Sequence, residues 1–333
     1  SEANGITLNP GQVLLVREMA TSGARVQLAI APAGSGKTTA MNALSQAWIE
    51  AGGSVLGLAP SAAAAAALGD QLSGETDTLA KLIWDLEFGN PASWKRKIGP
   101  KTLVVIDEAG MADTLALDAA VDFILNRGGS VRLIGDDQQL AAIGAGGVLR
   151  DIQASHGALR LTELRRFSDP AEGMASLSLR QGETAALGFY LDQRRIHVGD
   201  ETTMADDLFA AWSADRAGEL DSIMLAPTRE LVADLNRRAR NQRLGDTPTG
   251  RTVDLPDGNL ASAGDTIISR LNERTLRLTP TDWVKNGDRW EVARANNDGS
   301  LTVRRAGSKW RTTITLPAAY VAQHVELGYA VTA

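Results

Sequence analysis

The sequence contains no cysteine, and this absence excludes disulfide bonds, thiolate metal sites and a cysteine nucleophile. The histidines are few and far apart, at His156, His197 and His324, so a histidine-rich metal centre is not expected. No run of about eighteen apolar residues occurs, and therefore no membrane span is predicted. The first residues lack the basic and apolar regions of a signal peptide. Together these absences predict a protein of the reducing cytoplasm.

Positive charge is scarce overall, because 40 acidic residues outnumber 34 basic ones and give a formal net charge of −6. Taken alone, this balance argues against a nucleic-acid partner. The basic residues nevertheless gather in short runs at 95–97, 237–243 and 304–311. Two interpretations of each run stay open: a basic groove on an acidic body, or solvated helix and loop faces.

The length of 333 residues predicts two or three domains. From residue 26 onward, short apolar segments alternate with longer segments of helical periodicity. The continuous apolar character of the short segments is typical of strands that are buried on both faces of a parallel sheet. Strands are predicted at 26–30, 55–59, 103–106 and 131–135, with helices at 39–50 and 62–68. The alternation indicates an α/β layered domain with right-handed crossovers.

The same alternation restarts near residue 186, with a strand predicted at 223–226 and a helix at 230–242. A second α/β domain is therefore expected to begin there. The next segment contains short strands, predicted at 266–269, 289–293, 301–304 and 312–316. Asn286-Gly287 and Asp298-Gly299 supply the residue types that hairpin turns need. This segment predicts a small all-β barrel.

The segment 31–39 (Ala-Pro-Ala-Gly-Ser-Gly-Lys-Thr-Thr) follows an apolar strand and opens a helix, which is the context of a P-loop. Its glycines allow backbone N–H groups to turn toward phosphate oxygens, and the helix N-terminus adds partial positive charge. Lys37 is predicted to reach the β and γ phosphates, and the Thr38 hydroxyl to ligate Mg²⁺. The predicted ATP-binding residues are Ala33, Gly34, Ser35, Gly36, Lys37, Thr38 and Thr39. Ala31 stands where such loops usually begin with glycine, and a glycine-rich turn with a chance lysine is the alternative.

Two further strands end in polar residues at the same predicted sheet edge. The strand 103–106 delivers Asp107 and Glu108 at its carboxyl end, where ligands bind in open α/β sheets. One carboxylate such as Asp107 suffices for Mg²⁺, and Glu108 is then placed to orient and deprotonate the attacking water. The strand 131–135 is followed by Gln139, whose amide suits both the γ phosphate and that water. A salt-bridged strand end and a polar turn are the alternative interpretations.

The order of these three motifs resembles that of superfamily 1 DNA helicases. It is most similar to the RecD-like branch, and within it to the helicase region of MobF-type conjugative relaxases (the TraA/TraI/TrwC group). This resemblance implies that Gln12 reads adenine and that Arg166 meets the γ phosphate. It also implies DNA contacts at Pro60, Ser61, Thr78, Thr228 and Asn236. The partners it implies are ATP, Mg²⁺, single-stranded DNA, junctions of single and double strands, and conjugation proteins of a bacterial cytoplasm.

The resemblance also implies how the chain is divided. A RecA-like ATPase domain would cover 1–185, the first part of a second RecA-like domain 186–250, an SH3-like barrel insert 251–320, and a return into the second domain 321–333. Relatives carry a strand-splitting hairpin near 85–100, where basic residues flank Trp94 in this sequence. A wedge is one interpretation of this segment and an ordinary surface loop is the other. By resemblance, translocation would run 5′ to 3′.

The last residues raise an expectation about completeness. Residues 328–333 resemble the opening of a motif that couples ATP to DNA, and the remainder of that motif and a final arginine motif are not in the sequence. We therefore expect a helicase fragment with impaired ATP turnover. The scattered histidines and tyrosines do not supply the metal triad and nucleophiles of a relaxase domain. A nucleotide-gated module that only binds single strands is the alternative function, whereas a small-molecule kinase would leave the β-rich segment unexplained.

Overall fold

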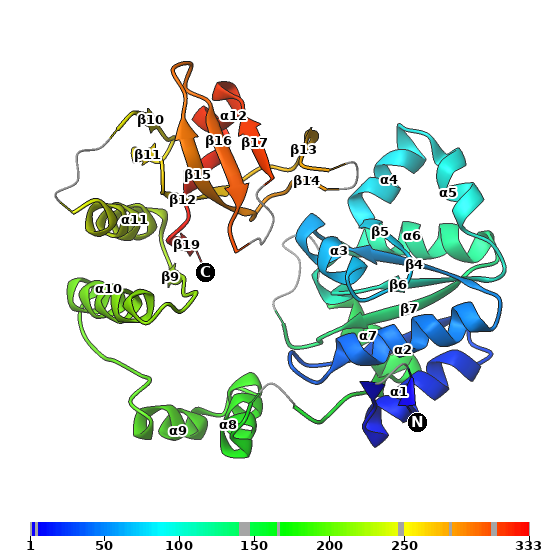
Figure 1. Cartoon of the computed structure of the whole chain (residues 1–333). Coiled ribbons are helices and arrows are strands. Elements are labelled where there is room, and N and C mark those ends of the chain that lie inside the picture. Colours follow the sequence, from blue (N-terminus) through cyan, green and yellow to red (C-terminus); the bar gives the residue numbers. More distant parts are fainter. Residues whose placement is uncertain are drawn as a thin grey trace. The chain divides into compact units, whose positions relative to one another are not determined.

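A computed structural model of the chain describes residues 2–3, 6–139, 147–164, 167–245, 250–279, 282–307 and 312–332. The chain forms two compact units, Ser1–Arg195 and Ile196–Ala333 (Figure 1). Within the described ranges, no helix is both long enough and apolar enough to cross a membrane.

The first unit alternates helices with short strands. Its helices are α1 (Pro10–Thr21), α2 (Lys37–Glu50), α3 (Ala62–Gly69), α4 (Leu79–Glu87), α5 (Pro91–Lys97), α6 (Thr114–Asn126), α7 (Val148–His156), α8 (Pro170–Arg180) and α9 (Leu187–Asp192), with 3-10 turns η1 (Ala109–Met111) and η2 (Thr184–Ala186). Its strands are β1 (Glu2–Ala3), β2 (Ile6–Thr7), β3 (Val26–Ile30), β4 (Ser54–Ala59), β5 (Glu75–Thr78), β6 (Thr102–Ile106), β7 (Ser130–Gly135) and β8 (Leu159–Arg160).

In the described part of this unit, six parallel strands form one sheet in the order β5-β4-β6-β7-β3-β8. Alternate residues of β6 pack on opposite faces of the sheet. Leu103 and Val105 join a core with α1 and α2, whereas Val104 and Ile106 join a core with α4 and α6. This two-sided burial explains the continuous apolar strands of the sequence and confirms the predicted α/β fold.

The segment 85–100, for which the sequence leaves both a wedge hairpin and a surface loop open, contains the end of α4 and all of α5. Trp94 is only 3% exposed, and its indole N–H donates to Asp85 Oδ2 at 2.7 Å. Trp94 therefore belongs to the core and does not form the tip of a wedge. The exposed aromatic residues of this helix pair are Trp84 (54%) and Phe88 (75%).

The second unit combines helices with mostly antiparallel strands. Its helices are α10 (Glu201–Ala217), α11 (Arg229–Leu244) and α12 (Ala318–His324). Its strands are β9 (Met224–Ala226), β10 (Thr252–Asp254), β11 (Leu260–Ser262), β12 (Thr266–Ser269), β13 (Glu273–Arg277), β14 (Trp283–Val284), β15 (Arg289–Ala295), β16 (Leu301–Arg305), β17 (Thr313–Leu316), β18 (Val325–Leu327) and β19 (Ala330–Thr332).

In the described part of this unit, β10 pairs with β11 and β13 with β14 as two-stranded antiparallel sheets, beside two further sheets. β9 and β19 pair in parallel, and among the described residues five antiparallel strands follow the order β17-β16-β15-β12-β18. The β15–β16 hairpin turns at Gly299, whose φ of +82° suits glycine, as Asp298-Gly299 predicted. β18 lies beyond residue 320, so the antiparallel sheet extends past the expected end of the β-rich insert. Closure into an SH3-like barrel stays a prediction.

The arginines of the run 237–243 are paired with acids of the same unit. Arg240 Nε and Arg243 Nε donate to the two carboxylate oxygens of Asp265, at 3.1 and 2.9 Å, and Asp265 is fully buried. Arg237 and Arg238 both pair with Asp234 on α11. The run is therefore largely neutralised within the unit and does not form the basic groove that the sequence left open.

Candidate nucleotide-binding site

The loop between β3 and α2 has the backbone of a phosphate-binding loop. Gly34 and Gly36 have φ angles of +83° and +78°, which residues with a side chain rarely adopt. Gly36 is the N-cap residue of α2 and supplies no side-chain cap. The first N–H groups of this helix are therefore suited to an anionic ligand.

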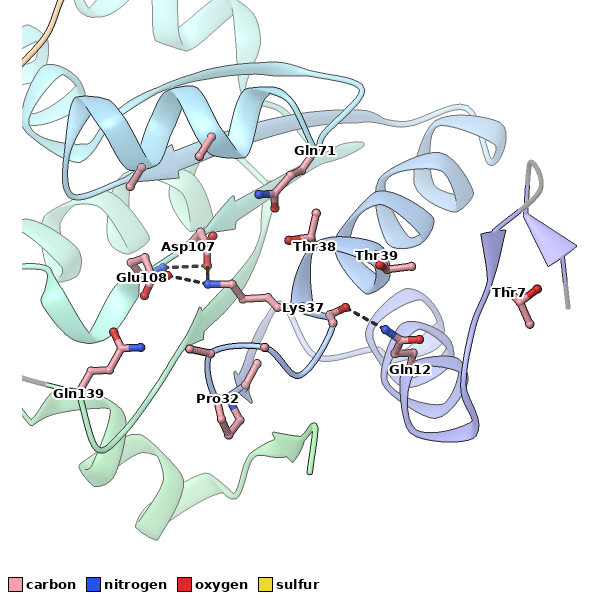
Figure 2. A pocket seen from close by; sticks show the side chains of 16 residues that line it. Thr7, Gln12, Pro32, Lys37, Thr38, Thr39, Gln71, Asp107, Glu108 and Gln139 are labelled. Atoms are coloured by element: carbon pink, nitrogen blue, oxygen red, sulfur yellow. Dashed lines mark hydrogen bonds and ion pairs between the residues drawn. The ribbon is translucent and has the colours of Figure 1, made fainter. Parts of the chain in front are cut away.

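Lys37 extends from the first turn of α2 toward the two acidic residues that follow β6 (Figure 2). Its Nζ lies 2.8 Å from Asp107 Oδ1 and 2.7 Å from Glu108 Oε1. Burial by itself would lower the pKa of the amine, but the two carboxylates outweigh it and raise that pKa above its ordinary value. The amine is therefore held as a positive charge beside the P-loop.

The backbone fixes the acidic pair. The Asp107 N–H donates to the Leu58 carbonyl at 2.9 Å, and Asp107 Oδ1 accepts the Glu108 N–H at 2.9 Å. Glu108 has a φ of +51°, a left-handed conformation that costs a residue with a side chain about 1 kcal/mol or more. Such strain persists where the surrounding structure over-determines a residue, and here the strained residue contacts Lys37.

One pocket of about 670 Å³ brings the three motifs together. The predicted site residues that line it are Gln12, Ala33, Gly34, Gly36, Lys37, Thr38, Thr39, Asp107, Glu108 and Gln139 (Figure 2). Ser35 is not among the lining residues and is 1% exposed. Its hydroxyl has no hydrogen-bond partner within the described part of the chain. Any contribution of Ser35 to nucleotide binding would therefore come from its backbone.

Part of the pocket wall was not predicted from the sequence. Ala64 and Ala67 of α3 and Gln71, just after α3, line the same pocket. Figure 2 places the Gln71 amide above Thr38. Gln71 Oε1 is buried and accepts no hydrogen bond from the residues that the structure describes. These residue types carry no motif signature, and only the packing of α3 beside the P-loop brings them to the site.

The amide of Gln12 holds the P-loop to the start of α1. Its Nε2 donates to the Gly36 carbonyl at 2.9 Å (Figure 2), and its Oε1 accepts the Asn9 N–H at 2.9 Å. Asn9 caps α1 in return and also donates from Nδ2 to Glu163 Oε2 at 3.0 Å. The contact between Gln12 and adenine stays a prediction, since the described partners of this amide belong to the protein itself.

Three residues expected to contact DNA are helix N-caps. The hydroxyl oxygens of Ser61, Thr78 and Thr228 accept backbone N–H groups of α3, α4 and α11 at 3.1, 3.1 and 3.2 Å. Ala59 pairs with Thr78 across β4 and β5, so Pro60 and Ser61 follow β4 at the sheet edge where Thr78 ends β5. Each capping hydroxyl keeps its own hydrogen for a further acceptor, such as a phosphate. The DNA contacts of these residues stay predictions.

Asn236, also expected to contact DNA, is completely buried. Its Nδ2 donates to the carbonyls of Leu327 and Ala330, both at 3.1 Å, and its Oδ1 accepts the N–H groups of Tyr329 and Ala330 at 3.0 and 2.8 Å. These four bonds use the full capacity of the amide. We therefore correct the expected DNA contact to a structural role. Arg166, expected at the γ phosphate, lies outside the described residues.

The chemistry of the pocket fits ATP with Mg²⁺. Mg²⁺ prefers oxygen ligands and keeps several waters, and the Thr38 hydroxyl and the Asp107 carboxylate offer oxygens to the same pocket. The buried Oε1 of Gln71 adds an oxygen in need of a donor, such as a metal-bound water. Positive charge for the phosphates comes from Lys37 and from the N-terminus of α2.

Residues 7–201 match the model of a protein family described as "AAA domain". The chain is 32% identical over 270 residues to the conjugal transfer protein TraA of Agrobacterium fabrum, which covers 79% of this chain and 24% of that protein. It is 31% identical over 318 residues to the conjugal transfer protein TraA of Rhizobium radiobacter, covering 93% of this chain and 27% of that protein. The chain thus spans about a quarter of the length of these relatives.

Among solved structures, the fold is similar to that of the Pif1 helicase from Candida albicans, with a TM-score of 0.54 at 16% identity. The similarity covers 98% of this chain and 86% of that chain. At this level of identity the likeness concerns the fold. The family match spans more than half of the 333 residues. The chain therefore belongs to the AAA domain family and, as its motifs predicted, resembles the TraA proteins in sequence.

Proposed function

We propose that the chain is an ATP-driven DNA helicase motor that moves 5′ to 3′ on single-stranded DNA as part of a conjugative relaxase-helicase. The observation that carries the proposal is the pocket in which Lys37 contacts both Asp107 and Glu108 beside the P-loop. The name of the TraA proteins suggests a role in conjugal transfer. The name of the Pif1 structure suggests a helicase.

Each residue of the pocket has a separate role in hydrolysis. When ATP binds, the positively charged Lys37 leaves the two carboxylates and pairs with the β and γ phosphates. Thr38 and Asp107 would hold Mg²⁺, and the bound ion would supply positive charge for the phosphate oxygens. Glu108, no longer paired with Lys37, orients and deprotonates the attacking water. Gln139, which lines the same pocket, also holds that water and responds to the presence of the γ phosphate.

Single-stranded DNA is proposed to cross the carboxyl edge of the parallel sheet. Ser61 and Thr78 lie at that edge, and α4, which begins after Thr78, presents the exposed Trp84, with the exposed Phe88 at its C-cap. Backbone contacts and stacking of bases on aromatic rings are tolerant of sequence, so little base preference is expected. The same helix would meet the junction at which the duplex opens.

A DNA-stimulated ATPase assay tests the proposal. We expect turnover to rise when single-stranded oligonucleotides are added to the chain, and Lys37→Ala to abolish nucleotide binding and turnover while the far-UV circular dichroism is unchanged. Lys101→Ala, which removes an exposed lysine away from the pocket, serves as the matched control. Unchanged nucleotide affinity and turnover in Lys37→Ala would refute the assignment of the P-loop.

The assay also separates this function from its alternatives. A nucleotide-gated module would bind both ATP and single strands, and its ATPase rate would not respond to DNA. A small-molecule kinase would be stimulated by a small acceptor and not by DNA. The exposed aromatic pair on α4 favours a nucleic-acid partner over a small acceptor, because stacked bases are its natural ligands.

A further inference from the structure

The turn that carries Gln139 is held by an arginine from outside the three motifs. Arg180 is the last residue of α8, some forty residues after the turn in the sequence. Its Nη2 contacts Asp136 Oδ1 and lies 2.9 Å from Asp137 Oδ1, so one nitrogen bridges two adjacent carboxylates. The side chains of Arg180, Asp136 and Asp137 are 20%, 5% and 12% exposed. The contact is therefore largely shielded from water.

The two carboxylates need this cation. Like charges on adjacent, nearly buried side chains repel each other, and removing one partner of a buried ion pair leaves an uncompensated charge. Arg160 Nη2 lies 3.9 Å from Asp137 Oδ2, which is farther than Arg180 and reaches only one of the two. Asp136 also accepts the Gln138 N–H at 3.0 Å, so its position sets the shape of the turn.

The turn packs directly against the segment that follows Asp107 and Glu108. A Cβ added to Gly110 would lie 3.2 Å from the Asp136 carbonyl oxygen, which leaves little room for movement between the two segments. Arg150 Nε of α7 also donates to the Asp137 carbonyl at 2.9 Å. A shift of the turn would therefore displace Gln139, which lines the nucleotide pocket together with Glu108.

Arg180 also belongs to the segment that leaves the ATPase unit. α8 and α9 are the last helices described before residue 195, where the first unit ends (Figure 1). Arg195 closes this segment on itself by pairing with Glu172 of α8. The Arg180 ion pairs thus join the nucleotide pocket to the helices that lead out of the unit.

We propose that Arg180 is a positioning residue that holds the turn of residues 136–139 and couples the nucleotide state of the pocket to the docking of α8. The inference rests on the proposed function, because it takes Gln139 to respond to the γ phosphate. Arg180 is not among the residues that line the nucleotide pocket. It acts through Asp136 and Asp137, and its loss uncouples α8 from the pocket.

Hydrogen–deuterium exchange of the whole chain tests this coupling, with and without magnesium and a non-hydrolysable ATP analogue. In the wild-type chain, we expect the analogue to change the exchange of peptides that cover α8. In Arg180→Gln, α8 should exchange faster, and its response to the analogue should disappear. Arg180→Lys keeps the charge but loses the guanidinium geometry, and should retain part of the response. Arg17→Gln removes an exposed arginine of α1 that contacts neither the turn nor α8, and should retain all of it.

Steady-state kinetics provide a second measurement. Arg180→Gln should lower the DNA-stimulated kcat about tenfold, within the range of mutations that alter coupling, and change the KM for ATP by less than about threefold. An α8 response that persists in Arg180→Gln overturns the inference. So does a wild-type chain that binds the analogue without any response of α8, and in that case the ATPase proposal still stands. A chain that fails to bind the analogue at all refutes the proposed function and the coupling with it.

Discussion

Glu108 combines a strained backbone with a carboxylate that pairs with Lys37 and remains 27% exposed in its side chain. Strain of this kind is concentrated at sites where a side chain must be aimed. The residue before it, Asp107, is more deeply buried and tied to the backbone of its neighbours. This difference favours Glu108 as the base and Asp107 as the residue that holds the metal.

We predict that Glu108→Gln keeps Mg·ATP binding but slows hydrolysis by roughly 10²-fold or more, since it removes the base and keeps the shape of the side chain. Binding is measured by calorimetry with a non-hydrolysable analogue, and hydrolysis by phosphate release. Glu50→Gln, an exposed change at the end of α2, should alter neither. A normal rate of hydrolysis in Glu108→Gln would place the base elsewhere.

Hydroxyl residues at strand ends show why the sequence predicts the nucleotide pocket better than the DNA contacts. Asp107 and Glu108 have few structural uses at the end of a buried strand, and Lys37 has few at the start of a helix, so their pattern is specific. Ser61 and Thr78 are the residue types that cap helices, and each caps one. The same residue types also suit contacts with DNA phosphates. A sequence pattern cannot separate these two uses, which need not exclude each other.

Helix α11 shows an element whose polar residues serve the fold. Its Asn236 binds the chain on both sides of Tyr329, over Leu327 to Ala330, and so fixes the strand β19 beside β9. The residues that it binds lie about ninety positions away, so no local pattern in the sequence could indicate the contact. The expected DNA contact came from the position of an asparagine in a motif, and burial overrides it.

We predict that Asn236→Ala destabilises the chain by about 3 kcal/mol, because it leaves several buried backbone groups without partners. Urea denaturation, followed by circular dichroism, measures the change in the free energy of unfolding. Asn241→Ala, at an exposed position of the same helix, should change it by less than about 0.5 kcal/mol. Asn236→Ala with native stability but weakened DNA binding would restore the contact expected from the sequence.

The exposed aromatic residues lie on α4 and at its end, whereas the sequence suggested Trp94, which belongs to α5. Leu79, Leu82 and Asp85 are its buried residues, which leaves Trp84 and Phe88 on the outer side, where Lys81 Nζ lies 4.9 Å from the centre of the Trp84 ring. The basic neighbours of Trp94 suggested an exposed tip, but its indole instead meets Asp85 in the interior. Burial within a pair of short helices is not visible in composition.

We predict that the double change Trp84→Ala and Phe88→Ala weakens binding of a single-stranded oligonucleotide about tenfold or more, since each stacked base contributes about 1–3 kcal/mol. Fluorescence anisotropy with a labelled oligonucleotide measures the affinity. Leu115→Ala, which removes another highly exposed apolar side chain from the same unit, is the control and should bind normally. Equal affinities of the double variant and the wild-type chain would exclude α4 from the DNA surface.

For the whole molecule, the α/β fold could be predicted because the strands of its parallel sheet are buried on both faces. Such strands are visible in the sequence as continuous apolar runs. The boundaries of strands β3 and β12 are those expected, and the other expected strands differ from the structure by one or two residues. Charge was harder to interpret. The arginines of the run 237–243 form ion pairs with Asp234 and with Asp265, and Asp265 is distant in sequence. Ion pairing of this kind depends on the tertiary fold.

This pairing sets the last prediction, on how salt affects DNA binding by a chain of net charge −6. Because the arginines of the run 237–243 are already paired with acids, we expect contact with only about two to four phosphates, and hence a slope of about −1.4 to −2.8 in log K against log salt for single strands. Stacking on α4 supplies the remaining affinity, so homopolymers of different bases should bind alike. Titrations of labelled oligonucleotides between low and moderate salt measure the slope. Affinity that does not change with salt would contradict phosphate contacts altogether. A much steeper slope would show that an extensive basic groove exists despite the ion pairs.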